Sequence, residues 1–191
     1  MSFYTGTQCE LLYSLPAAVT KNTYTTQAIL SATSAASRAI VPGGFFSSVP
    51  NGVGRVLYLK AQGTVATTSA ATLQMVLLWD PTPGTIGTTL ATPWPTLAPT
   101  AAVTCCWDLE AWITAQAVGG AGLTLQTNGR LWMSVVASGT LSTANQSIMF
   151  NSNTTGLNSE AQAAIELAGT WSASAAGNTT TLQQMQLFGL N

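Results

Sequence analysis

The chain has 191 residues, only 6% of them are charged, and its formal net charge is -1. Five dispersed basic residues cannot form the positively charged stripe that neutralises phosphates, so the composition argues against nucleic acid as a partner. No stretch reaches the roughly 18 consecutive apolar residues of a membrane span, and no basic segment followed by an apolar one opens the chain. We therefore expect synthesis in the cytoplasm without membrane insertion.

Residues 1–38 are rich in Thr, Ser and Ala and show no sustained period of two or 3.6 residues. Such a segment cannot bury a core of its own, so we expect an extended arm that becomes ordered against a neighbouring subunit. Its candidate partner contacts are apolar or aromatic: Phe3, Tyr4, Leu11, Leu12 and Tyr13. The alternative is that the segment packs on its own domain as an additional strand.

Residues 39–191 carry the turn and strand signals of one all-β domain. Apolar runs bounded by turn residues predict strands at 53–62, 73–79, 103–117, 123–126, 131–137, 147–150, 164–169 and 181–188. About eight strands at this spacing favour a jelly-roll β-sandwich of two sheets, to which residues 1–38 add the arm.

Three of the apolar runs end in Gly-Thr and lead through a short polar stretch into a second run, which predicts three hairpins. Their glycines are Gly63, Gly139 and Gly169. Asn128 and Gly129 predict a further two-residue hairpin turn between the strands at 123–126 and 131–137.

Two segments are expected to be loops, at residues 85–100 and 151–160. Pro93, Pro95 and Pro99 exclude a central strand from the first, because proline cannot donate a ladder hydrogen bond. Trp94, flanked by two of these prolines, is a candidate partner contact.

The strand at 103–117 alternates between two faces. The predicted core face holds Val103, Cys105, Trp107, Leu109 and Ala111, and the opposite face holds Thr104, Cys106, Asp108, Glu110 and Trp112. The adjacent cysteines are therefore expected to be one core thiol and one outward or interface thiol rather than a disulfide or a metal site.

The chemistry available to a catalyst is limited. The chain contains no His, which removes Ser-His-Asp and Cys-His arrangements and the usual zinc ligands. Asp108 and Glu110 are the local carboxylate pair that a glycoside-active enzyme would need, but acidic residues on an outward strand face are usually solvated or paired. We expect no enzyme activity and no cofactor. Most of the six tryptophans are expected in the core, including Trp79, Trp107 and Trp132.

The weakly charged surface is compatible with a subunit of a permanent assembly and equally with a secreted or cell-surface β protein. A resemblance to a known family supports the interpretation as a subunit of a permanent assembly. It spans roughly residues 40–191, and the segments that carry it are 42–46, 57–64, 106–113, 119–129, 136–140 and 147 onward. In these segments the chain resembles the jelly-roll head-decoration and other virion proteins of tailed bacteriophages, whose trimeric members have a tumour-necrosis-factor-like sandwich.

The resemblance implies a non-catalytic capsid decoration (cement) protein on the virion surface, with the major capsid protein and its own copies in a homotrimer as partners. The alternative is a tail-fibre or baseplate receptor-binding module for carbohydrate, which would need an exposed aromatic or acidic pocket. A more remote alternative is a glycoside-active enzyme using Asp108 and Glu110.

Overall fold

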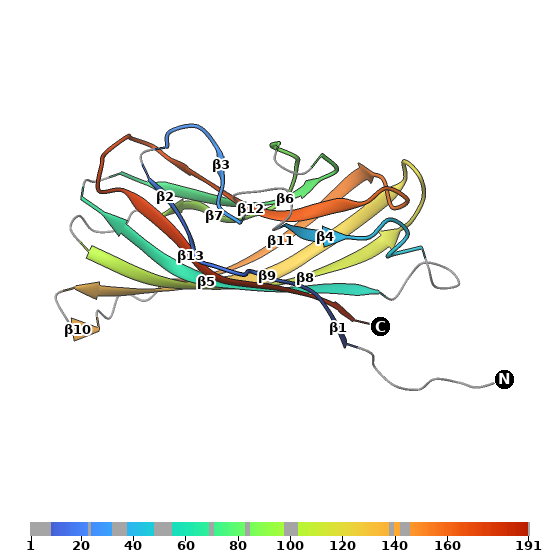
Figure 1. Ribbon diagram of the computed structural model, residues 1–191, viewed down its shortest axis with the longest axis horizontal. Coiled ribbons are helices and arrows are strands. Elements are labelled where there is room, and N and C mark those ends of the chain that lie inside the picture. Colours follow the sequence, from blue (N-terminus) through green and yellow to red (C-terminus); the bar gives the residue numbers. More distant parts are fainter. Residues whose placement is uncertain are drawn as a thin grey trace.

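Two antiparallel sheets pack face to face in the computed structural model of the chain (Figure 1). The structure describes residues 9–22, 24–31, 38–47, 55–68, 71–82, 85–97, 103–137, 140–141 and 146–190. These residues form thirteen strands, and among them no helix is long and apolar enough to span a membrane. The prediction of an all-β sandwich is confirmed.

Eight of the thirteen strands are long. They are β5 (Val56–Thr67), β6 (Leu73–Asp80), β7 (Thr88–Leu97), β8 (Val103–Ala117), β9 (Leu123–Ala137), β11 (Gln146–Leu157), β12 (Ala163–Trp171) and β13 (Thr179–Leu190). Seven of these overlap the eight predicted strands, because β9 spans two of the predictions while β7 lies in a predicted loop. The short strands are β1 (Cys9–Ser14), β2 (Val19–Asn22), β3 (Ala28–Ile29), β4 (Ala39–Val41) and β10 (Thr140–Leu141).

The larger sheet, called sheet A, has the order β1-β13-β5-β8-β9-β10, with β2 also pairing with β13 and β11 with β9. Sheet B has the order β3-β12-β6-β7, with β4 also pairing with β12. β5 pairs with β13 in sheet A. β6, which follows β5 in the chain, pairs in sheet B with β12, which precedes β13. These two nested pairs follow the strand order of a jelly roll, whereas β6–β7, β8–β9 and β9–β11 pair as near neighbours in the chain.

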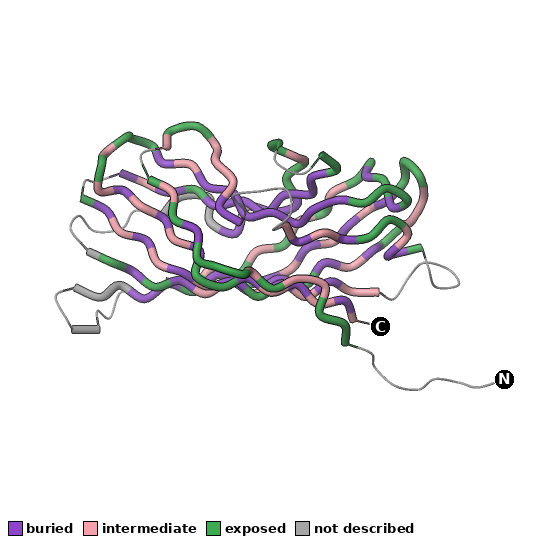
Figure 2. The backbone as a smooth tube through the Cα atoms, in the orientation of Figure 1, coloured by how far each residue is buried: buried purple, intermediate pink, exposed green. Residues whose placement is uncertain are grey.

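The two sheets differ in the number of faces that they bury. Nearly every residue of β6 and β12 is buried, whereas buried and more exposed residues alternate along β5. Continuous apolar runs are typical of strands covered on both faces, and alternating runs are typical of strands with one face in water. Figure 2 shows this alternation along the strands of sheet A. Sheet A therefore has an inner face in the core and an outer face open to solvent.

Only one of the three predicted Gly-Thr hairpins joins strands that pair with each other. β9 pairs with β11 in sheet A, but β5 and β6 lie in different sheets, and so do β12 and β13. An apolar run has the same sequence pattern whether the next run pairs beside it or crosses to the facing sheet. The prediction of hairpins after Gly63 and Gly169 is therefore wrong, and Gly139 itself lies outside the described residues.

Asn128 and Gly129 lie in the middle of β9, so the predicted turn between two strands is also wrong. A Cβ atom on Gly129 would lie 2.2 Å from the carbonyl oxygen of Glu110 and 2.4 Å from Cζ of Phe150. This glycine is required by the close approach of the strands on both sides rather than by a turn conformation.

Both predicted loops contain strand structure. β11 continues through Leu157 into the segment 151–160, and β7 occupies most of the segment 85–100. β7 is an edge strand of sheet B, and register shifts interrupt its pairing with β6. Prolines are tolerated at such an edge because the outward backbone groups need no partner strand.

The described part of residues 1–38 pairs with the body of the domain, which corrects the expectation of an arm ordered by a neighbour. β1 and β2 both pair with β13, and β3 pairs with β12. Leu30 is 1% exposed and belongs to the main core. These short strands satisfy backbone groups that would otherwise be unpaired at the sheet edges. The alternative interpretation, packing on its own domain, describes residues 9–22 and 24–31.

Candidate functional site

The open outer face of sheet A presents a grid of side chains from β5, β8, β9 and β11. The strand register aligns these side chains in three rows across the sheet. The first row is Tyr58, Trp112, Asn128 and Asn151; the second is Lys60, Glu110, Arg130 and Met149; the third is Gln62, Asp108, Trp132 and Ser147. We call this grid the platform.

The first row begins with a group of packed aromatic rings. The ring centroids of Tyr58 and Trp112 are 5.2 Å apart, and Tyr58 stacks on Phe188 of β13 at 6.0 Å. Trp112 is nevertheless 40% exposed, so it offers apolar surface to solvent while its neighbour supports it. Burial and then the charge of Glu110 raise the pKa of Tyr58 above its ordinary value.

The second row carries an ion pair. Nε and Nη2 of Arg130 both lie 3.0 Å from Oε2 of Glu110, and Lys60 lies opposite Glu110 on β5. With Asp108 in the third row, the platform holds four of the eleven charged residues of the chain, which has five basic and six acidic residues. Two of the four are positive and two are negative, so their formal charges cancel. In a chain with so few charges, this gathering on one exposed face makes the platform a candidate recognition surface.

Two shallow hollows lie on the platform and share the Glu110–Arg130 ion pair. The larger, of about 560 Å³, is also lined by Trp112, Asn128, Gly129, Met149, Phe150 and Asn151. The smaller, of about 360 Å³, is also lined by Lys60, Asp108, Trp132 and Ser147. Each hollow therefore has one exposed tryptophan, and the ion pair lies between the two tryptophan rows.

The faces predicted for β8 are confirmed. Cys105, Trp107 and Leu109 are buried, whereas Cys106 and Trp112 are exposed. The cysteines are thus one core thiol and one outward thiol, and both are free.

The tryptophans show one clear departure from prediction. Trp79 and Trp107 are buried as expected, but Trp132 is 40% exposed instead of lying in the core. The alternation in β9 contained the correct signal, because Trp132 shares the strand face of Arg130 rather than that of Leu131. The size and apolarity of the indole favour burial, but the position of Trp132 in the strand decides the face on which it lies.

The other candidate partner contacts do not form one site. Leu11 in β1 is exposed, while Leu12 and Tyr13 are half-buried and pack against the core. Phe3 and Tyr4 lie outside the described residues, as does the side chain of Trp94. None of the three described side chains lines a platform hollow.

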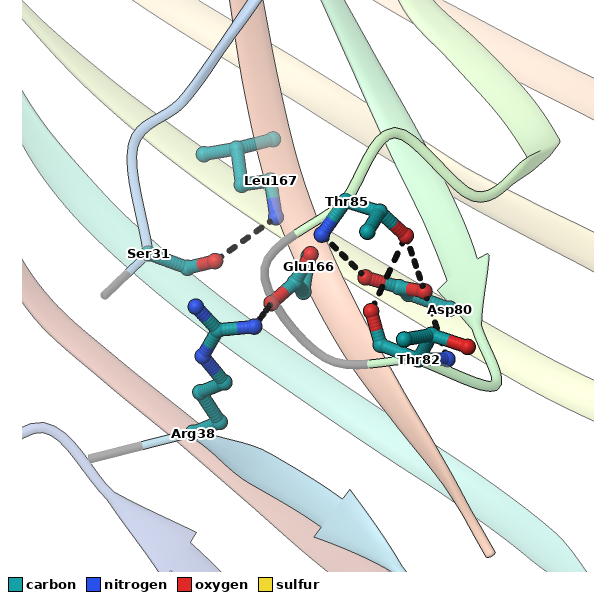
Figure 3. Close-up of polar contacts among 7 residues, drawn as sticks. All are labelled: Ser31, Arg38, Asp80, Thr82, Thr85, Glu166 and Leu167. Carbon is teal, nitrogen blue, oxygen red and sulfur yellow. Dashed lines mark hydrogen bonds and ion pairs between the residues drawn. The ribbon is translucent and has the colours of Figure 1, made fainter. Parts of the chain in front are cut away.

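A separate polar cluster is buried at sheet B (Figure 3). The carboxylate of Asp80 accepts hydrogen bonds from the backbone N of Thr82 at 2.9 Å and from the backbone N of Thr85 at 3.2 Å. The side chain of Glu166 is 1% exposed and lies 3.2 Å from Nη1 of Arg38. Burial raises the pKa of Glu166 to about 7, against the opposing effect of the Arg38 charge.

This buried cluster connects the N-terminal segment to the body. Oγ of Ser31 accepts a hydrogen bond of 3.1 Å from the backbone N of Leu167, next to the Arg38–Glu166 ion pair. Because Glu166 and Asp80 are closed to solvent, the contacts of this cluster are structural. The platform is the better candidate for binding.

No protein-family model matches the sequence, and no curated protein matches it. Among solved structures, the chain is similar to the CBM2 module of the evolved Dit of Lactobacillus casei BL23 phage J-1. That similarity covers 98% of both chains at 9% sequence identity, with a TM-score of 0.34. A similarity this distant does not show what the chain binds or does. The evidence for a function is therefore the geometry of the platform.

Proposed function

We propose that the chain is a carbohydrate-binding module of a bacteriophage virion, and that its platform attaches the virion to glycans of the host surface. The observation that carries the proposal is the pair of exposed tryptophans, Trp112 and Trp132, placed on either side of the row that holds the Glu110–Arg130 ion pair on an open sheet face. The receptor-binding alternative requires an exposed aromatic or acidic pocket, and the platform has that character.

The chemistry of the platform is complementary to sugars. One face of a sugar ring carries C–H groups that pack on an indole, while its hydroxyl groups both donate and accept hydrogen bonds. Asn128 and Ser147 lie beside the exposed tryptophans, and such amide and hydroxyl side chains also offer donors and acceptors. An open, shallow surface suits a long polymer better than a small buried ligand.

The same face is less suitable for a permanent protein interface. The centres of such interfaces are depleted of charged residues, whereas the platform concentrates Lys60, Asp108, Glu110 and Arg130. Burying these groups between subunits would require desolvating all four. We therefore expect the predicted homotrimer, if it forms, to use another surface.

We further propose that binding is non-catalytic. Asp108 and Glu110 share the outer face of β8, as predicted, but Glu110 is paired with Arg130. An inverting or retaining glycosidase needs its two carboxyl groups on opposite sides of the scissile bond. Two neighbours on one flat strand face would both lie below a bound glycan.

Glycan binding does not decide where in the virion the chain lies. Capsid decoration therefore stays a prediction beside the receptor-binding role. A receptor-binding module predicts a few to dozens of copies per particle, and a decoration protein that contacts the major capsid protein predicts hundreds. Gel densitometry of purified virions against the major capsid protein distinguishes these numbers. A low copy number supports the attachment role, and a high one supports decoration.

The glycan-binding proposal is tested by sedimentation of the protein with purified host cell walls. Replacing Trp112 and Trp132 by Ala should lower the affinity at least about tenfold, which corresponds to about 1.4 kcal/mol. Ile86→Ala is the matched control, because Ile86 is 48% exposed and lines neither platform hollow. Equal binding by the wild-type chain, the double variant and the control contradicts the proposal.

A further inference from the structure

We infer that the ligand of the platform is an extended, uncharged glycan that lies across both hollows and over the Glu110–Arg130 ion pair. The inference rests on the proposed carbohydrate-binding function and specifies the length and charge of the ligand. Three features of the platform lead to it: the spacing of the tryptophans, the balance of the charges, and the chemistry of the remaining side chains.

The spacing of the tryptophans sets the length. Trp112 lies on β8 in the first row, and Trp132 lies opposite Asp108 in the third row. Four residue steps along a strand separate these rows, which is about 13 Å at roughly 3.3 Å per residue. One sugar ring cannot contact both indoles over that distance. Only a chain of several rings running approximately along the strands occupies both hollows.

The charges select against charged sugars. Arg130 has two of its nitrogens directed at Glu110, so its guanidinium is already engaged by a carboxylate. An anionic glycan would meet the carboxylates of Asp108 and Glu110, which offset the charge of Lys60, while Arg130 is already engaged. A cationic glycan would meet Lys60 and Arg130. An uncharged polymer avoids both repulsions, and its binding should depend little on salt.

The remaining polar side chains are neutral and bifunctional. Gln62 donates a 2.9 Å hydrogen bond to Oε1 of Gln184 at the edge of the platform, and Nε2 of Gln126 donates to Oδ1 of Asn151 at the opposite side. These contacts hold amide groups in position on both sides of the tryptophan rows. Positioned amides bind hydroxyl groups without attracting a net charge.

The ion pair is the specificity-determining element in this arrangement. Glu110→Gln removes one negative charge, leaves the side chain similar in size, and releases Arg130 from its carboxylate partner. The variant platform carries a net positive charge and a guanidinium that can pair with an acidic sugar. Glu110→Gln should therefore gain affinity for an anionic glycan. Glu10 is an exposed acid on β1, away from the platform, so Glu10→Gln is the control for the change in net charge.

The test is calorimetric titration of the wild-type chain with matched oligosaccharides. The neutral probes are the dimer and hexamer of N-acetylglucosamine and of glucose, the cationic probe is the glucosamine hexamer, and the anionic probe is a galacturonic acid hexamer. We expect at least one neutral hexamer to bind about tenfold or more tighter than its dimer and than both charged hexamers. That affinity should be unchanged between about 0.05 and 0.5 M NaCl.

The results distinguish an error in the length or charge of the ligand from an error in the carbohydrate-binding function. Tighter binding of a charged hexamer, or equal affinity for dimer and hexamer, overturns the inference but leaves carbohydrate binding in place. No gain in galacturonate affinity in Glu110→Gln removes the ion pair as the specificity determinant. Absence of binding by every probe, together with equal sedimentation of the Trp112/Trp132 variant on host cell walls, overturns the proposed function itself.

Discussion

At the scale of single residues, the face of the strand on which a tryptophan lies decides whether its indole packs in the core or is exposed on the platform. Trp107 and Trp112 both belong to β8, but Trp107 is buried against the core and Trp112 lies on the platform. Gly63 opposite Trp107 shows how closely the core residue is packed. A Cβ atom on that glycine would lie 2.7 Å from Cζ2 of Trp107.

The two tryptophans therefore predict different costs of truncation. Trp107→Ala should lower the free energy of unfolding by about 3 to 5 kcal/mol through cavity formation. Trp112→Ala should lower it by only about 1 kcal/mol, mainly through the lost contact with Tyr58. Chemical denaturation of both variants measures the difference. Similar losses would show that the outer face is not open as described.

Glu166 predicts the pH dependence of stability. Its folded-state pKa of about 7 lies above the ordinary value of 4.5, so the folded protein holds this proton more tightly than the unfolded chain. The stabilisation from the protonated group is complete below about pH 4.5 and is lost as the pH rises through about 7. The charged groups that act on it are Arg38 and Asp80.

Glu166→Gln reproduces the neutral form at every pH and should remove this dependence. In thermal unfolding scans, the stability of the variant relative to the wild-type chain should increase between about pH 5 and pH 8. Glu10→Gln, which replaces an exposed acid, should follow the wild-type profile. Parallel profiles for Glu166→Gln and the wild type would show that the carboxyl is not buried as described.

At the scale of elements, sequence patterns predicted which residues form strands better than how the strands connect. The alternation of 103–117 correctly separated the two faces of β8. The Asn128–Gly129 pair was misleading, because a glycine that is needed for close strand approach has the same sequence signature as one that is needed for a turn. The prolines of β7 excluded a central strand but not an edge strand.

The N-terminal segment is the element whose predicted role changed most. Its sequence lacks a sustained period because β1, β2 and β3 are short edge strands that pair with different parts of β12 and β13. β3 has only two residues, and burial does not alternate along β1, so neither strand imposes a period of two on the sequence. Deleting residues 2–37 is thus expected to destabilise the domain and not merely to remove a tether.

Two leucines of this segment allow a matched test. Leu30 is 1% exposed and Leu11 is 54% exposed. Leu30→Ala should reduce the free energy of unfolding by about 2 to 5 kcal/mol, as at other buried leucines. Leu11→Ala should change it by less than about 0.5 kcal/mol. A small effect at both positions, measured by urea denaturation, would restore the picture of an independent arm.

At the scale of the whole molecule, the two sheets of the sandwich differ in the number of faces that they bury. Residues on both sides of β6 and β12 in sheet B are buried, so the outer face of sheet A is the open sheet face on which we propose that a glycan binds. This difference between the sheets is predictable from the sequence, because β6 and β12 are continuous apolar runs and β8 alternates. The platform was not predictable as a site because its rows combine residues from four strands whose register only the folded chain defines.

We expect a glycan to bind across Trp112 and Trp132, and the indole N–H signals of a ¹⁵N-labelled sample report on both contacts. Assignments come from single Trp→Phe variants, and the ligand is the tightest-binding neutral hexasaccharide at saturation. The signals of Trp112 and Trp132 should shift, while those of the buried Trp79, Trp107 and Trp171 should stay in place. Saturation with no shift of the Trp112 and Trp132 signals would show that the glycan does not bind on the platform.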